Sequence, residues 1–83
     1  MSKSPPSRRI VADVARRLKA ERIRRQISMT QLAEQSGLSQ QMISYVERGM
    51  RSPTLDTLLR ISAALNVDLS TLLNAASKGK PQR

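Results

Sequence analysis

The residues of this chain best suited to chemistry are polar side chains that share one face of a short helix expected to begin at residue 40. At about 100° per residue, they fall within an arc of about 140°, and mainly apolar residues take the other side. The polar face consists of Gln40, Gln41, Ser44, Tyr45 and Arg48, and the opposite side of Met42, Ile43, Val46 and Glu47. A carboxamide can bond N6 and N7 of adenine together, so Gln40 and Gln41 are candidate base readers in a DNA major groove, with Ser44 and Tyr45 beside them.

This face also has simpler interpretations. Two glutamines on a surface helix can be merely solvated. The Tyr45 ring can contact a thymine methyl or a phosphate, or it can fold against neighbouring side chains. Tyr45 is the only aromatic residue of the chain, so stacking on single-stranded bases is not the expected mechanism. Duplex DNA is therefore the better partner, and the turn that precedes the helix favours base reading by the glutamines over simple solvation.

Those residues predict a second short helix and a tight turn. Ser28 and Gln31 have the spacing of a capping box, in which each side chain bonds the backbone amide of the other residue. Gly37 suits the left-handed residue that ends a helix, because glycine adopts that conformation at least cost. Ser39 is the next N-cap candidate. Two short helices joined at Gly37 are therefore expected.

Four residues of this segment match the helix-turn-helix signature: Ala33, Gly37, Ile43 and Val46 occupy its small, glycine and two aliphatic places. On these residues the chain resembles the phage repressor and Cro-type family, also called the xenobiotic response element (XRE) type, over about residues 14–73. The resemblance implies an all-α fold, a compact five-helix bundle of the lambda-repressor-like type. Its helices 2 and 3 would form the helix-turn-helix.

The resemblance also implies a structural ion pair. In the family, an arginine of the first helix pairs beneath the surface with a glutamate near the end of the recognition helix, and the matching residues here are Arg22 and Glu47. The alternative is that Arg22 is one more solvated base in an arginine-rich helix. A buried pair would fix the orientation of helix 1 more than it would add stability, because desolvation offsets much of the attraction.

Two positions depart from the family. Gln26 stands where a glycine is common, which predicts either a strained glutamine or a different turn. Met29 and Thr30 open helix 2 where polar residues are frequent, and this leaves Thr30 or the helix amides to contact a flanking phosphate. The complete set of expected phosphate contacts is Thr30, Ser39, Arg48 and Arg51.

The apolar spacing predicts three further helices. The first covers about residues 10–25, the next begins near Pro53 with Ser52 or Thr54 as its cap, and the last covers Leu69 to Asn74. Most of their leucines are expected in the core. The family often dimerises through the last helix and its approach, so some of these side chains can face a second copy: Val67, Leu69, Leu72 and Leu73.

The charge is strongly basic and unevenly distributed, with a formal net charge of +9. Residues 1–25 carry nine basic and two acidic side chains, and the seven residues 77–83 carry three basic side chains and no acidic one. A polyanionic partner is expected. We expect a disordered basic arm at residues 1–8, a domain at residues 9–76 and a flexible basic tail at residues 77–83. A basic helix can also bind membranes, but an apolar side without Trp or Phe suits a bundle better.

The composition argues against several functions. The chain has no cysteine and no histidine, and its six scattered carboxylates form no close pair, so we expect no enzyme, no metal and no other cofactor. No small-molecule site is evident. No apolar run approaches the roughly 20 residues that span a bilayer, and no secretory leader is apparent, so a cytoplasmic protein is expected.

The main hypothesis is a sequence-specific transcriptional regulator that binds double-stranded DNA, as a homodimer reading an inverted repeat. The alternative is an antitoxin-like subunit that uses this fold to bind a partner protein, with DNA binding secondary. An antitoxin would be expected to have a longer segment beyond the fold to wrap its partner. A nonspecific nucleic-acid binder would instead bind all sequences equally, with steep salt dependence.

Overall fold

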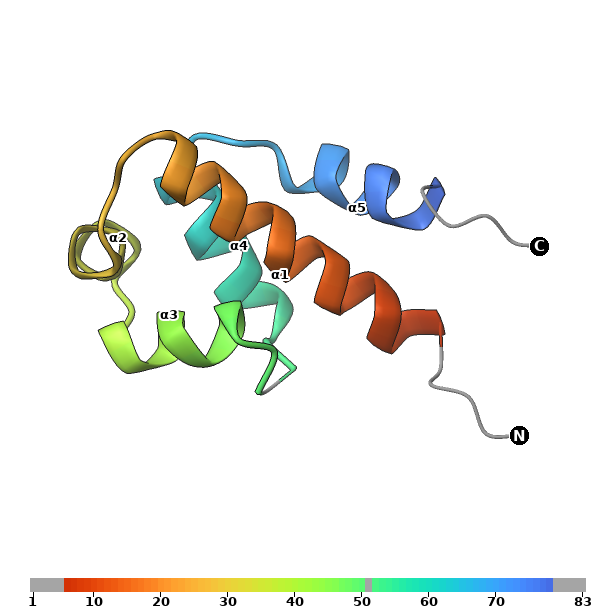
Figure 1. The fold of residues 1–83 in the computed structure, drawn as a ribbon, viewed down its shortest axis with the longest axis horizontal. Coiled ribbons are helices and arrows are strands. Elements are labelled where there is room, and N and C mark those ends of the chain that lie inside the picture. The colour runs from red at the N-terminus through yellow and green to blue at the C-terminus, as the bar shows by residue number, and fades with distance from the viewer. Residues whose placement is uncertain (1–5, 51, 79–83) are drawn as a thin grey trace.

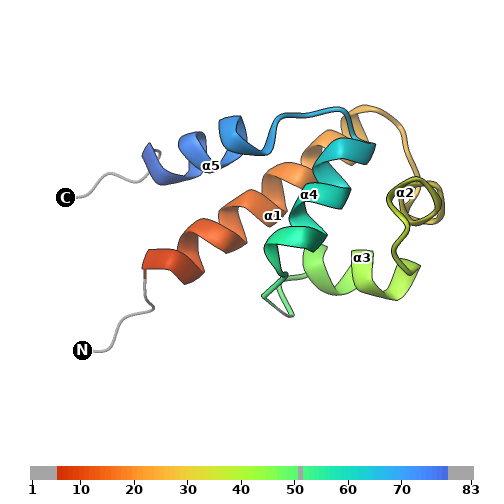
Figure 2. The same ribbon diagram turned by 180° about the vertical axis from the view of Figure 1, so that it is seen from behind.

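The computed structural model describes residues 6–50 and 52–78, which form five helices and no strand. The helices are α1 (Pro6–Arg24), α2 (Met29–Ser36), α3 (Gln40–Glu47), α4 (Leu55–Ala64) and α5 (Leu69–Lys78) (Figure 1). The long helix α1 runs through the middle of the bundle. Helices α2, α3 and α4 gather toward its C-terminal half, and α5 folds back along its N-terminal half (Figures 1 and 2). The predicted all-α bundle is confirmed.

One apolar core connects all five helices. Its largest fully buried side chains come from α1, α2, α3 and the end of α4, and α5 adds Leu69 and Ala76. The largest members are Val14, Leu18, Leu32, Ile43, Val46 and Leu65. Burying one such side chain contributes about 1.5 to 3 kcal/mol relative to leaving it exposed. This core fixes α3 at the edge of the bundle.

Local hydrogen bonds set the boundaries of α2 and α3. The Ser28 hydroxyl accepts from the Gln31 amide at 3.0 Å, and the Gln31 side chain accepts from the Ser28 amide at 2.9 Å. The Ser39 hydroxyl accepts from the Met42 amide at 3.0 Å. Gly37 between the helices is left-handed, with φ 76°. The predicted capping box, second N-cap and turn glycine are confirmed.

A glutamine occupies the left-handed turn that ends α1. Gln26 has φ 59°, its amide donates to the Ile23 carbonyl at 2.9 Å, and the Ile27 amide donates to the Arg22 carbonyl at 3.1 Å. This pair of bonds is the Schellman motif, which usually has glycine at the left-handed position. The departure from the family at Gln26 is therefore accommodated by a strained residue and not by a different turn.

Replacing Gln26 with glycine is expected to raise the free energy of unfolding by about 0.5 to 1 kcal/mol. The left-handed conformation costs a side chain roughly 1 to 2 kcal/mol, and the larger entropy of glycine in the unfolded chain offsets part of the gain. Denaturant unfolding measures the change. Asn66→Gly is the matched control, since Asn66 also has φ 59° but asparagine tolerates this region better. A gain at Asn66 as large as that at Gln26 would contradict the strain at Gln26.

The two end helices are longer than predicted. Helix α1 begins at Pro6 instead of near residue 10, because the fixed φ of proline suits the first helical position. Helix α5 continues past Asn74 to Lys78, since Ala76 is buried against the core. Residues 6–8 and 77–78 are thus helical, not part of an arm or tail. The rest of the expected arm and tail lies outside the described residues.

Helix α4 differs from the prediction in how its leucines are placed. Thr54 is its N-cap, accepting from the Thr57 amide at 3.1 Å, and Pro53 lies just before the cap. Leu55 and Leu59 are 63% and 49% exposed, so they are exceptions to the expectation that most of the leucines lie in the core. The helix is apolar on more than one side, and the core covers only the side that carries Leu58.

Four side chains are candidates for contact with a second copy, and one of them, Leu69, lies in the core. It is only 5% exposed, whereas the other three are partly buried and pack at the margin of the core. Those three are Val67, Leu72 and Leu73. Leu69 thus packs mainly in the core, and it reaches the surface only where it lines a hollow between α4 and α5.

Candidate nucleic-acid interface

Helix α3 presents the expected polar face to the outside of the bundle. Ile43 and Val46 are buried and fix the helix by its other side. Gln40, Gln41 and Arg48 are exposed, and Ser44 and Tyr45 are half-buried. The structure thus brings the four candidate base readers together on one accessible strip.

The carboxamide of Gln40 is held by the neighbouring helix. The Thr30 hydroxyl, in the first turn of α2, donates to Gln40 Oε1 at 3.0 Å. No other bond to the Gln40 side chain occurs within the described part of the chain, so its Nε2 group remains able to donate. This contact joins α2 to α3 across the turn between them. It could not be predicted from the sequence, because it depends on how the two helices are placed.

A second hydrogen bond ties Gln41 to Tyr45, one helical turn further along. Gln41 Nε2 donates to the Tyr45 hydroxyl at 2.7 Å. The bond leaves the Gln41 carbonyl oxygen and its second N–H free to bind elsewhere. The four-residue spacing was visible in the sequence and could have indicated this pair. Both glutamines are therefore held in defined orientations before any ligand binds.

The residues expected to contact phosphates lie around this strip, and their polar groups differ in whether they are already hydrogen-bonded. The Thr30 hydroxyl already donates to Gln40, so it would have to exchange that partner to donate to a phosphate. Ser39 accepts a bond as the N-cap of α3 and keeps its own hydrogen for donation. Arg48 is exposed at the end of α3. Arg51 lies outside the described residues.

The expected ion pair between Arg22 and Glu47 is present beneath the interface. Arg22 Nε and Nη2 donate to the two oxygens of Glu47 at 2.7 and 3.0 Å, and the side chains are only 11% and 5% exposed. Arg22 Nη1 also donates to the Ile27 carbonyl at 2.8 Å. One guanidinium thus joins α1, the strained turn that follows it and the end of α3.

Several other arginines are paired with partly or fully exposed carboxylates. The pairs join Asp13 with Arg16 and Arg17, Glu21 with Arg24 and Arg25, and Asp56 with Arg60, at 2.6 to 3.2 Å. Burial raises the pKa of Asp13, but hydrogen bonds and charges from Arg17 and Arg16 outweigh it and hold that pKa below its ordinary value. Hydrogen bonds from Arg24 and Arg25 lower the pKa of Glu21. Asp13 and Glu21 therefore stay ionised at neutral pH and cancel part of the basic surface.

Uncompensated positive charge is confined to fewer positions. Within residues 6–50 and 52–78, four cations make no hydrogen bond or ion pair with a carboxylate: Arg8, Lys19, Arg48 and Lys78. Arg48 adjoins the polar strip of α3 directly. No group of histidine, cysteine or acidic residues in the described ranges could hold a metal ion, and no helix there is long and apolar enough to cross a membrane.

Comparison with known protein families identifies nearly the same segment as the sequence motif, about residues 14–73. Residues 18–72 match the model of a helix-turn-helix family. The chain belongs to this helix-turn-helix family. The match covers the end of α1, all of α2 to α4 and the start of α5, and it confirms the resemblance to the XRE type seen in the sequence.

Similar members of the helix-turn-helix family carry names of regulators. The uncharacterized HTH-type transcriptional regulator Rv0474 of Mycobacterium tuberculosis is 44% identical over 55 residues, which are 66% of this chain and 39% of that protein. The regulator SutR of Escherichia coli is 39% identical over 64 residues, 77% of this chain and 36% of that protein. The immunity repressor protein of Bacillus phage phi105 is 35% identical over 60 residues, 72% of this chain and 42% of that protein. The match thus spans less than half the length of each of these relatives, whose names describe them as transcriptional regulators or as a repressor.

Proposed function

We propose that this chain binds double-stranded DNA sequence-specifically in the cytoplasm and acts in transcriptional regulation, with α3 as the recognition helix. The observation that carries the proposal is the pair of oriented carboxamides on the exposed face of α3. A solvated surface would not require either glutamine to be fixed by another side chain. Orientation before binding removes part of the entropy cost of docking a side chain on a base edge.

Each polar residue of the strip has a distinct role in this account. Gln40 donates through Nε2 to an acceptor such as adenine N7, while Thr30 keeps its carbonyl oxygen in place. Gln41 uses its free oxygen and second N–H on the neighbouring base pair, supported by Tyr45. Ser44 lies one turn beyond Gln40 and contacts the next base edge.

Contacts with the phosphate backbone supply affinity and register but no sequence information. We assign them to Ser39 at the start of α3, Arg48 at its end and Arg51 in the following segment, and to the amides at the start of α2 in place of Thr30, whose hydroxyl stays on Gln40. The resulting affinity should fall as salt rises, because counterions are released when the phosphates are neutralised.

We also propose that the protein acts as a homodimer on an inverted repeat whose half-site centres lie about one helical turn apart. The support is an apolar hollow between α4 and α5, lined among others by Leu55, Leu59, Val67 and Leu73. Leu55 and Leu59 are large apolar side chains that are exposed in the single chain. A second copy packed over them would remove this apolar surface from water. In this proposal, the dimer contact involves α4 as well as α5.

Replacing Leu59 with glutamate is expected to convert the dimer to a monomer and to weaken binding to the inverted repeat at least tenfold. A carboxylate in an apolar contact is costly to desolvate, whereas on the free surface it is harmless. Sedimentation equilibrium measures the mass, and a duplex with one half-site tests whether each monomer still binds. Ile23→Glu is the matched control, since Ile23 is also exposed but lies at the end of α1. Equal masses for both variants and the unmodified protein would contradict this contact.

Selection from randomised duplexes tests the proposed function as a whole. The expected result is enrichment of an inverted repeat with half-site centres about 10 base pairs apart. Enrichment of no sequence, despite retained folding, would overturn sequence-specific binding. Binding of all duplexes alike would then indicate a nonspecific binder, and binding of none would favour the antitoxin-like interaction with a partner protein.

A further inference from the structure

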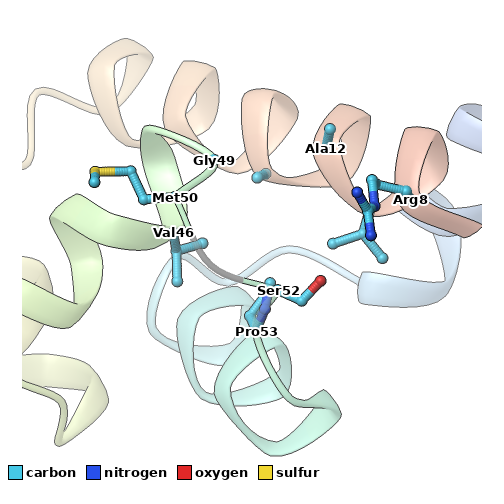
Figure 3. Close-up of a pocket in the computed structure, with 9 residues that line it drawn as sticks. Arg8, Ala12, Val46, Gly49, Met50, Ser52 and Pro53 are labelled. Carbon is cyan, nitrogen blue, oxygen red and sulfur yellow. The ribbon is translucent and has the colours of Figure 1, made fainter. Parts of the chain in front are cut away.

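A hollow of about 310 Å³ separates the N-terminal half of α1 from the segment that joins α3 and α4. Figure 3 shows Arg8 on α1 and Ser52 on the joining segment on opposite sides of it. Val11, Ala15 and Val46 contribute apolar walls. The hollow therefore has polar groups on two sides and apolar walls between the elements that carry them.

The α1 wall of this hollow does not come from the part of the chain that matches the family. Helix α1 begins at Pro6, and the match begins at residue 18, so residues 6–17 form three additional turns of helix. These turns supply Arg8, Val11 and Ala15. A ligand bound in the hollow would thus contact this extension as well as the matched segment.

The charge at the hollow is positive and uncompensated. Arg8 is exposed and makes no hydrogen bond or ion pair with any of the described residues, unlike Arg16 and Arg17 further along the same helix, which share Asp13. Arg48, also without a carboxylate partner, is at the end of α3, next to Gly49 in the hollow's lining. An anion is the ligand that this arrangement favours.

The position of the hollow points to one source of that anion. A recognition helix lies in a major groove about 12 Å wide, so its ends approach the two phosphate backbones that border the groove. The segment following α3 therefore stands beside one backbone, and Gly49, Met50 and Ser52 of this segment line the hollow. A guanidinium offers two parallel N–H donors to phosphate oxygens, and a serine hydroxyl can add a third.

We propose that Arg8 and Ser52 bind a backbone phosphate of the DNA duplex across this hollow, next to the phosphate contact made by Arg48. The inference rests on the proposed DNA binding and extends it with a clamp that the α1 extension adds to the helix-turn-helix. Because the clamp contacts only the backbone, it increases affinity on all sequences and leaves discrimination between them unchanged.

Replacing Arg8 with glutamine tests the clamp. Affinity for the preferred duplex is expected to fall about fivefold to tenfold at low salt, and the slope of log Kd against log salt should decrease by about 1. The ratio of affinities for preferred and scrambled duplexes should not change. Arg16→Gln removes the same charge from an exposed site on the same helix, and it should change the slope by much less, because Asp13 already compensates that arginine. Equal effects of the two variants, or an unchanged slope for Arg8→Gln, would overturn the clamp.

Neutral methylphosphonate linkages locate the contact. If the clamp exists, one linkage beside the groove should weaken binding of the unmodified protein, and Arg8→Gln should cause no further loss on that duplex. Additive losses at every linkage would contradict it. Stabilisation of the free protein by inorganic phosphate at matched ionic strength, lost in Arg8→Gln, would assign the hollow to a free anion instead. If the unmodified protein bound preferred and scrambled duplexes equally, the proposed function itself would be wrong. That result is distinct from failure of the clamp alone, in which discrimination remains and only the effect of Arg8→Gln is absent.

Discussion

Replacing Glu47 with alanine is expected to lower the free energy of unfolding by about 3 to 5 kcal/mol. The substitution leaves the Arg22 guanidinium buried without its carboxylate, although it keeps its bond to the Ile27 carbonyl at 2.8 Å. An uncompensated buried charge costs far more than an ion pair contributes. Denaturant unfolding at low temperature measures the loss, which is a large fraction of the stability usual for a small domain.

A double-mutant cycle separates the pair from its surroundings. Arg22→Met combined with Glu47→Leu should recover most of the loss, because replacing both charges with apolar groups removes the desolvation cost together with the attraction. Arg16→Met is the control for losing an exposed arginine. A coupling energy near zero between Arg22 and Glu47 would show that the bonds at 2.7 and 3.0 Å do not fix α3 energetically.

Replacing Gln40 or Gln41 with alanine is expected to cost about 1 to 3 kcal/mol on the preferred duplex, a loss of roughly fivefold to more than a hundredfold in affinity. Binding to a scrambled duplex should barely change, since the phosphate contacts remain. The variants therefore lose specificity together with affinity. Titration of both duplexes at one salt concentration measures the two effects.

The oriented carboxamides also make the contribution of Thr30 measurable. Thr30→Val keeps the shape of the side chain but removes the donor to Gln40 Oε1, so part of the Gln40→Ala loss should appear. Gln35→Ala, at an exposed glutamine of α2, is the control and should leave the affinity for both duplexes unchanged. If Gln40→Ala and Gln41→Ala keep full discrimination, α3 does not read bases through these residues.

The local features of the fold were predictable because the bonds that make them join residues close in sequence. The capping box of Ser28 and Gln31, the left-handed Gly37 and the cap at Ser39 each depend on residues within a few positions of one another. The ion pair of Arg22 with Glu47 spans 25 residues and was expected only through resemblance to the family. Apart from the bond between Gln41 and Tyr45, whose four-residue spacing was visible, the features missed were set by the relative placement of helices.

Three such misses are informative. The bond between Thr30 and Gln40 depends on the angle at which α2 meets α3, and no periodicity of either helix contains it. The exposure of Leu55 and Leu59 depends on which side of an apolar helix the other four helices cover. The hollow beside Arg8 required the start of α1 to be placed at Pro6, where the sequence suggested a disordered arm.

The central claim is that α3 reads bases in duplex DNA. Its most direct test is titration of the unmodified protein with the duplex recovered by selection and with a scrambled duplex of equal length and composition, at near-physiological salt. Binding to the selected duplex is expected to be more than about a thousandfold tighter than binding to the scrambled duplex, within the range usual for specific regulators. Equal affinity for both duplexes would contradict base reading by α3.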